Sequence, residues 1–158
     1  MQVIDDYLIN AETFIIEPIY GEFGQLFSKV HEERGSYIVK KKPINLIKES
    51  CLYYGAGYKG RLDSSIKATG FQKKVPICIF EGQKIFFFPL GSPNNDDSSW
   101  VAHYHVEKVT SIGPQLSYIY FMNRLKIEVP FSKAVIEGEV MRTAQLRFIM
   151  LKRWNEEN

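Results

Sequence analysis

Residues 50–69 read Ser50-Cys-Leu-Tyr-Tyr-Gly55-Ala-Gly-Tyr-Lys-Gly60-Arg-Leu-Asp-Ser-Ser65-Ile-Lys-Ala-Thr69. Gly55, Gly57 and Gly60 formally match the Gly-x-Gly-x-x-Gly fingerprint of dinucleotide-binding folds. That fingerprint needs a preceding strand and a long crossover helix within successive βαβ units. Gly70 and Pro76 leave room here for only about two helical turns, and the segments that follow have the pattern of hairpins. The stretch therefore favours a glycine-rich connection in an α+β fold over a doubly wound sheet, and a nucleotide-dependent enzyme that uses these glycines is the alternative.

Short segments rich in aromatic and β-branched residues surround this region and predict antiparallel strands. They cover residues 14–18, 25–31, 36–40, 75–80, 84–88, 100–112, 116–122 and 125–129. A helix is predicted from Pro43 up to Gly55, and a second over 63–69. After Pro130, one helical face collects Ile136, Val140, Ala144, Leu151 and Trp154, which predicts a C-terminal helix over about 134–155. The order of elements predicts a mainly antiparallel β-sheet with a short helix-loop-helix insertion and a C-terminal helix, that is, the α+β class.

The composition is that of a folded chain with reduced thiols. The 158 residues are 45% hydrophobic and 14% aromatic, which supports a packed core. Cys51 and Cys78 form no disulfide framework. The sequence lacks the pattern of a secretory signal or of a membrane-spanning segment, so we expect a cytoplasmic, nucleoid-associated protein.

The charge of the chain is distributed unevenly. Residues 40–74 contain nine basic and two acidic residues, a net charge of +7, whereas the remaining residues contain 11 basic and 16 acidic ones, a net charge of −5. A local positive field of this kind attracts polyanions although the whole chain carries only +2. The sequence therefore predicts a nucleic-acid contact within residues 40–74.

Residues 55–61 are predicted to form a mobile basic loop between the two short helices. Its glycines would let backbone amides approach an anionic strand, with charge from lysine and arginine and a stacking or wedging ring from tyrosine. An arginine in a narrow A·T-rich minor groove would add sequence preference without reading single bases. The candidate DNA-binding residues are Tyr58, Lys59, Gly60, Arg61, Lys67, Lys73 and Lys74. The structural alternative is a solvated basic loop.

Other motifs have simpler structural explanations. His103 and His105 would share one face of a strand, as some metal sites require, but no third ligand is apparent and a structural role is favoured. A Cys51 nucleophile lacks a group to orient its base. We therefore expect no catalytic residue, metal or cofactor.

Aromatic and basic residues elsewhere also allow two interpretations. The run Phe86-Phe87-Phe88 and the pair Tyr118 and Tyr120 could stack single-stranded bases, although buried strand core is the favoured interpretation. A second basic stripe could include Arg142, Arg147, Lys152 and Arg153, but a solvated helix face explains these residues equally well.

Several segments, taken in order along the chain, carry a resemblance to a known family. They are Lys42-Pro43-Ile44 through Cys51, Tyr53-Tyr54-Gly55, Tyr58-Lys59-Gly60-Arg61, Val75-Pro76-Ile77, Ile85-Phe86-Phe87-Phe88-Pro89, Trp100-Val101-Ala102-His103-Tyr104-His105-Val106 and Arg142-Thr143-Ala144. In these residues, over about 42–146, the chain resembles the competence transcription factor ComK family of Gram-positive bacteria. The first forty residues match less well, and better-known members continue beyond the position of Asn158 into a tail associated with regulated proteolysis.

The resemblance implies a non-enzymatic activator of DNA-uptake genes that recognises paired A·T-rich boxes chiefly through the minor groove. The expected partners are double-stranded A·T-rich DNA, further copies of the chain in a homodimer or higher homo-oligomer, and RNA polymerase, with no membrane. Residues 1–158 would form a single DNA-binding domain. The DNA-contacting roles of Tyr58, Gly60 and Arg61 are inferred from charge and geometry. A module that binds a partner through its C-terminal helix, without nucleic acid, is a third hypothesis.

Overall fold

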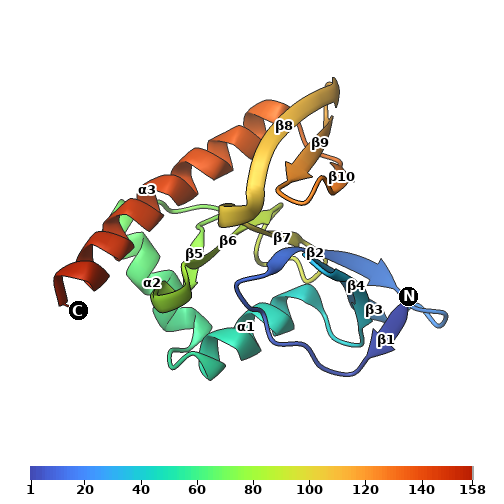
Figure 1. The fold of residues 1–158 in the computed structure, drawn as a ribbon, viewed down its shortest axis with the longest axis horizontal. Coiled ribbons are helices and arrows are strands. Elements are labelled where there is room, and N and C mark those ends of the chain that lie inside the picture. Colours follow the sequence, from blue (N-terminus) through green and yellow to red (C-terminus); the bar gives the residue numbers. More distant parts are fainter. Residues whose placement is uncertain (158) are drawn as a thin grey trace.

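The computed structural model describes residues 1–157 and has the predicted α+β architecture (Figure 1). Its strands are β1 (Gln2–Ile4), β2 (Thr13–Tyr20), β3 (Leu26–Glu32), β4 (Gly35–Val39), β5 (Ile77–Phe80), β6 (Ile85–Leu90), β7 (Ser99–Ala102), β8 (Val106–Gly113), β9 (Leu116–Phe121) and β10 (Lys126–Val129). Its helices are α1 (Pro43–Tyr53), α2 (Tyr58–Thr69) and α3 (Lys133–Glu157), with short 3-10 turns η1 (Glu81–Gln83) and η2 (His103–His105).

The strands form two sheets. Seven strands pair in the order β1-β4-β3-β2-β7-β6-β5, and all neighbours are antiparallel except β1 and β4. The other sheet has the order β10-β9-β8 and is antiparallel throughout. This pairing by hairpins is the arrangement expected from the short strands and tight turns of the sequence.

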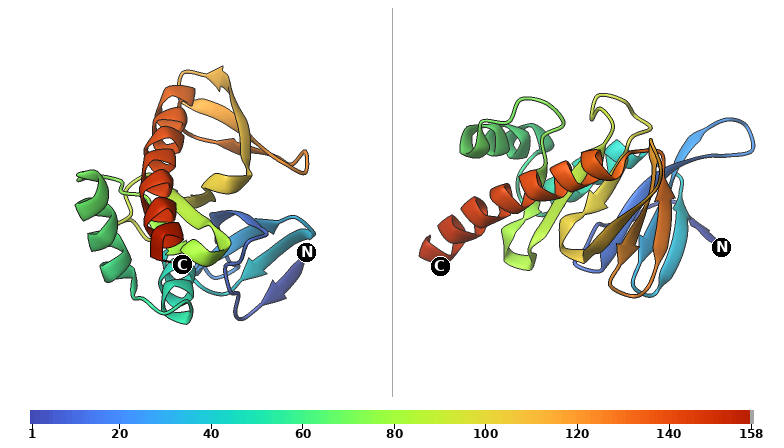
Figure 2. Two further views of the ribbon diagram at one scale, coloured as in Figure 1. Left: turned by 60° about the vertical axis from the view of Figure 1, so that its left-hand side comes forward. Right: turned by 90° about the horizontal axis from the view of Figure 1, so that it is seen from above.

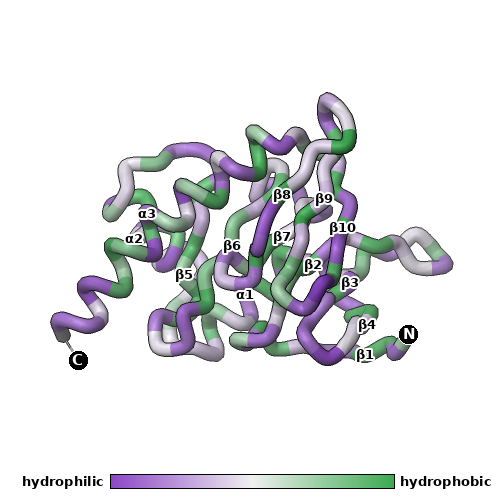
Figure 3. The backbone as a smooth tube through the Cα atoms, turned by 45° about the horizontal axis from the view of Figure 1, so that its top comes forward, coloured by the Kyte–Doolittle hydropathy of each residue, from purple (hydrophilic) through white to green (hydrophobic). Residues whose placement is uncertain are grey.

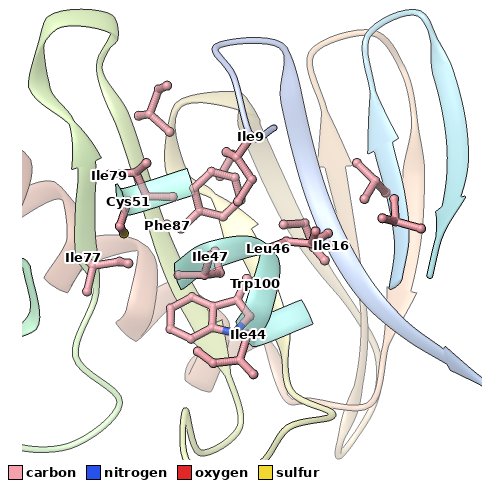
Figure 4. Packing of buried hydrophobic residues seen from close by; sticks show 14 residues of the cluster. Ile9, Ile16, Ile44, Leu46, Ile47, Cys51, Ile77, Ile79, Phe87 and Trp100 are labelled. Carbon is pink, nitrogen blue, oxygen red and sulfur yellow. The ribbon is translucent and has the colours of Figure 1, made fainter. Parts of the chain in front are cut away.

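Each face of the large sheet buries a separate set of side chains. On one face, Phe87 of β6 and Trp100 of β7 pack against Ile44 and Ile47 of α1 (Figure 4). The neighbouring residue Phe88 points to the opposite face, because side chains alternate along a strand. There it contacts the inner face of β8–β10 and the start of α3. The run of three phenylalanines is therefore buried core, as predicted.

Helix α3 crosses the molecule from the small sheet to the free edge of the large one, where it lies beside α2 (Figures 1 and 2). Hydrophilic and hydrophobic residues alternate along it as far as its C-terminal end (Figure 3). No helix among residues 1–157 is both long and apolar enough to span a membrane.

The buried face of α3 differs from the predicted one. It consists of Ile136, Glu139, Thr143, Leu146 and Met150, whereas Ala144 is exposed. The centres of the two faces differ by about 80° around the helix axis, nearly a quadrant, since each residue turns the helix by about 100°. The buried face contains a Glu and a Thr, so a pattern of apolar residues alone could not identify it.

Two predicted segments have different boundaries in the structure. The strand predicted over 100–112 is interrupted by η2, so its first part joins the large sheet and its second part the small one. Helix α2 begins at Tyr58 rather than at residue 63. The prediction that residues 58–61 lie in a mobile loop is therefore wrong, because they form the first turn of α2.

Candidate nucleic-acid interface

A four-residue connection joins α1 to α2 and exposes the N-terminus of α2. Gly55 has φ of +103°, a left-handed conformation that favours glycine. Gly57 is the N-cap of α2, in an extended conformation and without a side-chain hydrogen bond to the helix. The first N–H groups of a helix have no acceptor within it, and the helix dipole makes this end positive. Such an end can accept a phosphate.

The first turn of α2 leaves open space at Gly60. A Cβ atom built on Gly60 would have no heavy atom within 4 Å, and the residue is exposed. The backbone here can therefore come close to a ligand on the outer side of the helix.

Lysines occupy the exposed face of α2. Lys59 has 88% of its side chain exposed, and its Nζ atom lies 3.0 Å from Oδ2 of Asp63. Exposed pairs of this kind contribute little stability, so a phosphate can replace the carboxylate. Lys67 lies two turns further along the same face and is also exposed. The twelve residues of α2 extend about 18 Å, which corresponds to about five base pairs along a DNA strand.

Arg61 lies on the opposite face of α2 and points into the protein. Its Nη1 atom is 2.9 Å from Oε1 of Glu81 in η1, and only 11% of its side chain and 15% of that of Glu81 are exposed. The prediction that Arg61 projects from a loop towards DNA is therefore corrected. In this structure the side chain anchors α2 to the turn between β5 and β6.

Tyr58 is also engaged within the protein. Its ring packs edge-on against Trp100 with 6.3 Å between centroids, and Nζ of Lys48 lies 5.9 Å from the Tyr58 centroid. Burial raises the pKa of the Tyr58 hydroxyl. Because Lys48 lies over the ring of Tyr58, it stands beside the start of α2. Lys48 is exposed, and the predicted site did not include it.

The segment that follows α2 is held by α3. Arg142 donates hydrogen bonds to the backbone carbonyls of Lys73 (2.5 Å) and Lys74 (3.3 Å), and its guanidinium stacks over the ring of Phe71. Arg142 also pairs with Glu139 of its own helix. The side chains of Lys73 and Lys74 are exposed, so this backbone clamp places two cations beyond the C-terminal end of α2.

Two other cations of the +7 region, Lys41 and Lys42, have carboxylate partners. Nζ of Lys41 lies 2.9 Å from Asp6 and 2.6 Å from Glu49, and Nζ of Lys42 lies 3.1 Å from Asp96. These hydrogen bonds to carboxylates raise the pKa of Lys41. The positive charge available to a ligand is consequently centred on α2, Lys48 and residues 73–74.

The three glycines lack the context of a dinucleotide site. Helix α1, not a strand, precedes them, and the strands that follow pair antiparallel. In dinucleotide-binding folds the fingerprint joins a strand to a crossover helix of a parallel sheet. Here the glycines form a tight connection between two helices.

The residues considered for catalysis or metal binding have structural environments. Burial raises the pKa of the Cys51 thiol to about 11, which disfavours a thiolate. His105 lies in a 3-10 turn, where its Nε2 atom is 2.5 Å from the carbonyl oxygen of Ala11 and its ring packs on Phe14. The prediction of two histidines on one strand face is therefore wrong. No cluster of three metal-ligating side chains occurs in the described part of the chain.

Two tyrosines expected in the core lie instead on the outer face of the small sheet. Nζ of Lys126 is 4.4 Å from the ring centroid of Tyr118, and Nζ of Lys108 is 4.7 Å from that of Tyr120. Both tyrosines are partly exposed. They shield the strands of the small sheet, and their lysine partners cover the rings.

Comparison with known proteins identifies the family of this chain. The family model described as ComK protein matches residues 4–155, which extends the range of resemblance to both sides of 42–146. A "Competence transcription factor" of Bacillus subtilis (strain 168) is 29% identical over 144 residues, covering 91% of this chain and 74% of that protein. No solved structure matches the chain. Because the family match extends over nearly all of its residues, the chain belongs to the ComK family.

Proposed function

We propose that this protein is a non-enzymatic, DNA-binding activator of competence genes and that it contacts DNA with the outer face of α2. The observation that carries this proposal is the exposed cationic face of α2, whose N-terminus is open, in a chain similar to a competence transcription factor. A helix N-terminus and lysines together favour phosphate over any neutral ligand.

The DNA backbone would bind at two places along α2. The N–H groups of the first turn and Lys59 would contact one phosphate group, and Gly60 would allow the close approach. Lys67, Lys73 and Lys74 would contact phosphates further along the duplex. This surface would lie along the narrow minor groove of an A·T-rich box, where the negative potential is strongest.

Arg61 and Tyr58 would act indirectly in this arrangement. The pair between Arg61 and Glu81 fixes α2 against η1, and Tyr58 fixes the start of α2 against Trp100. Both contacts hold the first turn in place before DNA arrives, so less conformational entropy is lost on binding.

Two A·T-rich boxes would be bound by two copies of the chain, and a surface of α3 would join the two copies in a homodimer. One face of α3 is packed inside, but Met141, Ala144, Phe148 and Leu151 form a second stripe at alternating spacings of three and four residues, and Ala144 and Leu151 of this stripe belong to the face suggested by the sequence. Met141 is 73% exposed and Phe148 69%. This spacing suits a helix from a second copy of the chain, and two copies would place two α2 helices on two boxes.

Titration of an A·T-rich and a G·C-rich duplex at two salt concentrations tests the proposal. If about six phosphates are neutralised per bound unit, log affinity falls with log salt at a slope near −5. The A·T-rich duplex should bind more tightly at both concentrations. Equal affinities would leave only unspecific attraction of polyanions, and the absence of binding would contradict the proposal.

A further inference from the structure

Leu52 is a large aliphatic residue in an unusual position beside the proposed interface. It lies in the last turn of α1, and it is 66% exposed. Its Cδ2 atom is 3.8 Å from the position that a Cβ atom on Gly57 would take, so its side chain lies next to the N-cap of α2. Single exposed leucines are common, and the surroundings of this one therefore decide whether it has a role.

Two exposed cations belong to the helix turns next to Leu52. Lys48 is one helical turn earlier on α1 and is exposed, and Lys59 is in the first turn of α2. The neighbouring Tyr53 is equally exposed but lies on another side of α1, where Asp6 and Glu49 line the surface. Leu52 thus belongs to the positively charged surface, whereas Tyr53 does not.

Backbone hydrogen bonds at the end of α1 hold Leu52 in place. The N–H of Tyr54 donates to the carbonyl of Ser50, that of Gly55 to Leu52, and that of Ala56 to Cys51, over 3.0–3.2 Å. Cys51, the adjacent residue, is completely buried. The side chain of Leu52 is therefore mounted on a fixed helix end rather than on a flexible loop.

We propose that Leu52 is an apolar wedge that enters the minor groove and partly separates two stacked base pairs of an A·T-rich box. This inference rests on the proposed DNA contact through α2. Leucine is among the side chains that proteins insert between base steps from the minor groove, and pyrimidine–purine steps such as TA unstack easily. Lys48 and Lys59 would hold the phosphates on either side of the opened step.

The charges around Leu52 favour nucleic acid over an apolar protein pocket as the occupant. A protein pocket for Leu52 would have to bury Lys48 and Lys59 at its rim or provide carboxylates for them. A duplex provides a phosphate for each lysine and an apolar interior between its base pairs. One ligand then satisfies both kinds of side chain.

The test uses a duplex in which 2-aminopurine replaces one adenine of an A·T-rich box, because unstacking of this base increases its fluorescence. The full chain should increase the fluorescence on binding. Leu52→Ala should lower affinity roughly tenfold and abolish the increase. Leu52→Lys should keep affinity near that of the original chain, through an added phosphate contact, and still give no increase.

Met122→Ala is the matched control, since Met122 is 59% exposed in the turn between β9 and β10. It should bind and unstack the box as the unchanged protein does, and thermal unfolding should show all variants folded. A fluorescence increase with Leu52→Ala, or none with the unchanged protein bound to DNA, would overturn the wedge while leaving the DNA contact intact. Loss of unstacking with Met122→Ala would also overturn it. No DNA binding by the unchanged protein would instead refute the proposed function itself.

Discussion

The guanidinium of Arg61 and the carboxylate of Glu81 form an ion pair of 2.9 Å that is largely removed from solvent. Arg61 belongs to the first turn of α2 and Glu81 to η1, so the pair joins the proposed DNA-binding helix to the edge of the large sheet. A pair with this degree of burial differs from the surface pair of Lys59 and Asp63, because loss of one partner leaves the other charge buried.

Glu81→Ala is therefore expected to destabilise the protein by about 3 kcal/mol. For a chain of this length the melting temperature should fall by about 6–12 °C. Lys59→Ala, which removes an exposed cation, should change it by no more than about 2 °C and instead weaken DNA binding.

The double variant Arg61→Met with Glu81→Leu separates the anchoring role of Arg61 from a contact with DNA. Apolar residues of similar volume can replace a buried ion pair at little cost. We expect this variant to recover most of the lost melting temperature and to bind the A·T-rich duplex almost normally. Normal stability with lost affinity would show that Arg61 touches DNA after all.

Gly60→Ala is expected to raise stability and lower DNA affinity. Alanine in a helix is more stable than glycine by about 0.5–1 kcal/mol, and the space around Gly60 is open. The added methyl group would nevertheless obstruct a phosphate that approaches the backbone. Gly138→Ala in α3 is a matched control, because it too has open space, and it should raise stability without changing affinity. Unchanged DNA affinity in Gly60→Ala would argue against close approach at the first turn of α2.

The sequence was sufficient to predict the fold class, but it could not show that the side chain of Arg61 points into the protein. Alternating apolar residues and turn signals identified most strands, and Pro43 marked the start of α1. The glycines between the two helices favour the prediction of a mobile loop, but in the structure Gly57 is an N-cap and α2 begins directly after it. Glu81, the partner of Arg61, lies twenty residues further along the chain. No local sequence pattern indicates this ion pair, because it depends on how η1 packs against α2.

Distant contacts also explain why part of the interface was missed. Lys73 and Lys74 were identified by charge, but their position depends on Arg142, about seventy residues later in the chain. Leu52 is 66% exposed, which the apolar pattern of α1 does not indicate. Lys41 is one of the nine basic residues counted in residues 40–74, and the count cannot show that Asp6 and Glu49 neutralise it.

The salt dependence of DNA binding should distinguish free from paired lysines. Lys59→Gln and Lys73→Gln should each make the slope of log affinity against log salt shallower by about 1, because each removes one phosphate contact. Lys41→Gln should leave the slope unchanged, since its carboxylate partners already satisfy the cation. Binding measured by fluorescence anisotropy at four or more salt concentrations gives these slopes. Equal changes for all three variants would mean that the surface of α2 is not the principal contact.

Stability should decrease in mild acid because of His105. Burial lowers the pKa of His105 below its ordinary value of 6.5, so the unfolded chain binds the proton more readily than the folded one. The contribution of neutral His105 to stability is therefore complete above pH 6.5, the pKa of histidine in the unfolded chain. It is lost as the pH falls from there towards the lower pKa of His105 in the folded protein. Urea unfolding at pH 7.5 and 5.5 measures the difference. In His105→Gln, whose amide can still donate to Ala11, the difference should be smaller, and an unchanged difference would assign the effect to other groups.

Phe148→Glu is expected to convert a dimer into a monomer. Phe148 is 69% exposed in the middle of the second stripe of α3, so its loss costs the monomer little, whereas a charge there prevents a second helix from packing against it. Sedimentation or light scattering measures the mass, with Met122→Glu as a control for an added surface charge. The monomer should bind a single A·T-rich box as the unchanged chain does, but bind paired boxes more weakly, because two linked contacts reinforce each other. An unchanged mass for Phe148→Glu would place the interface between copies on another surface.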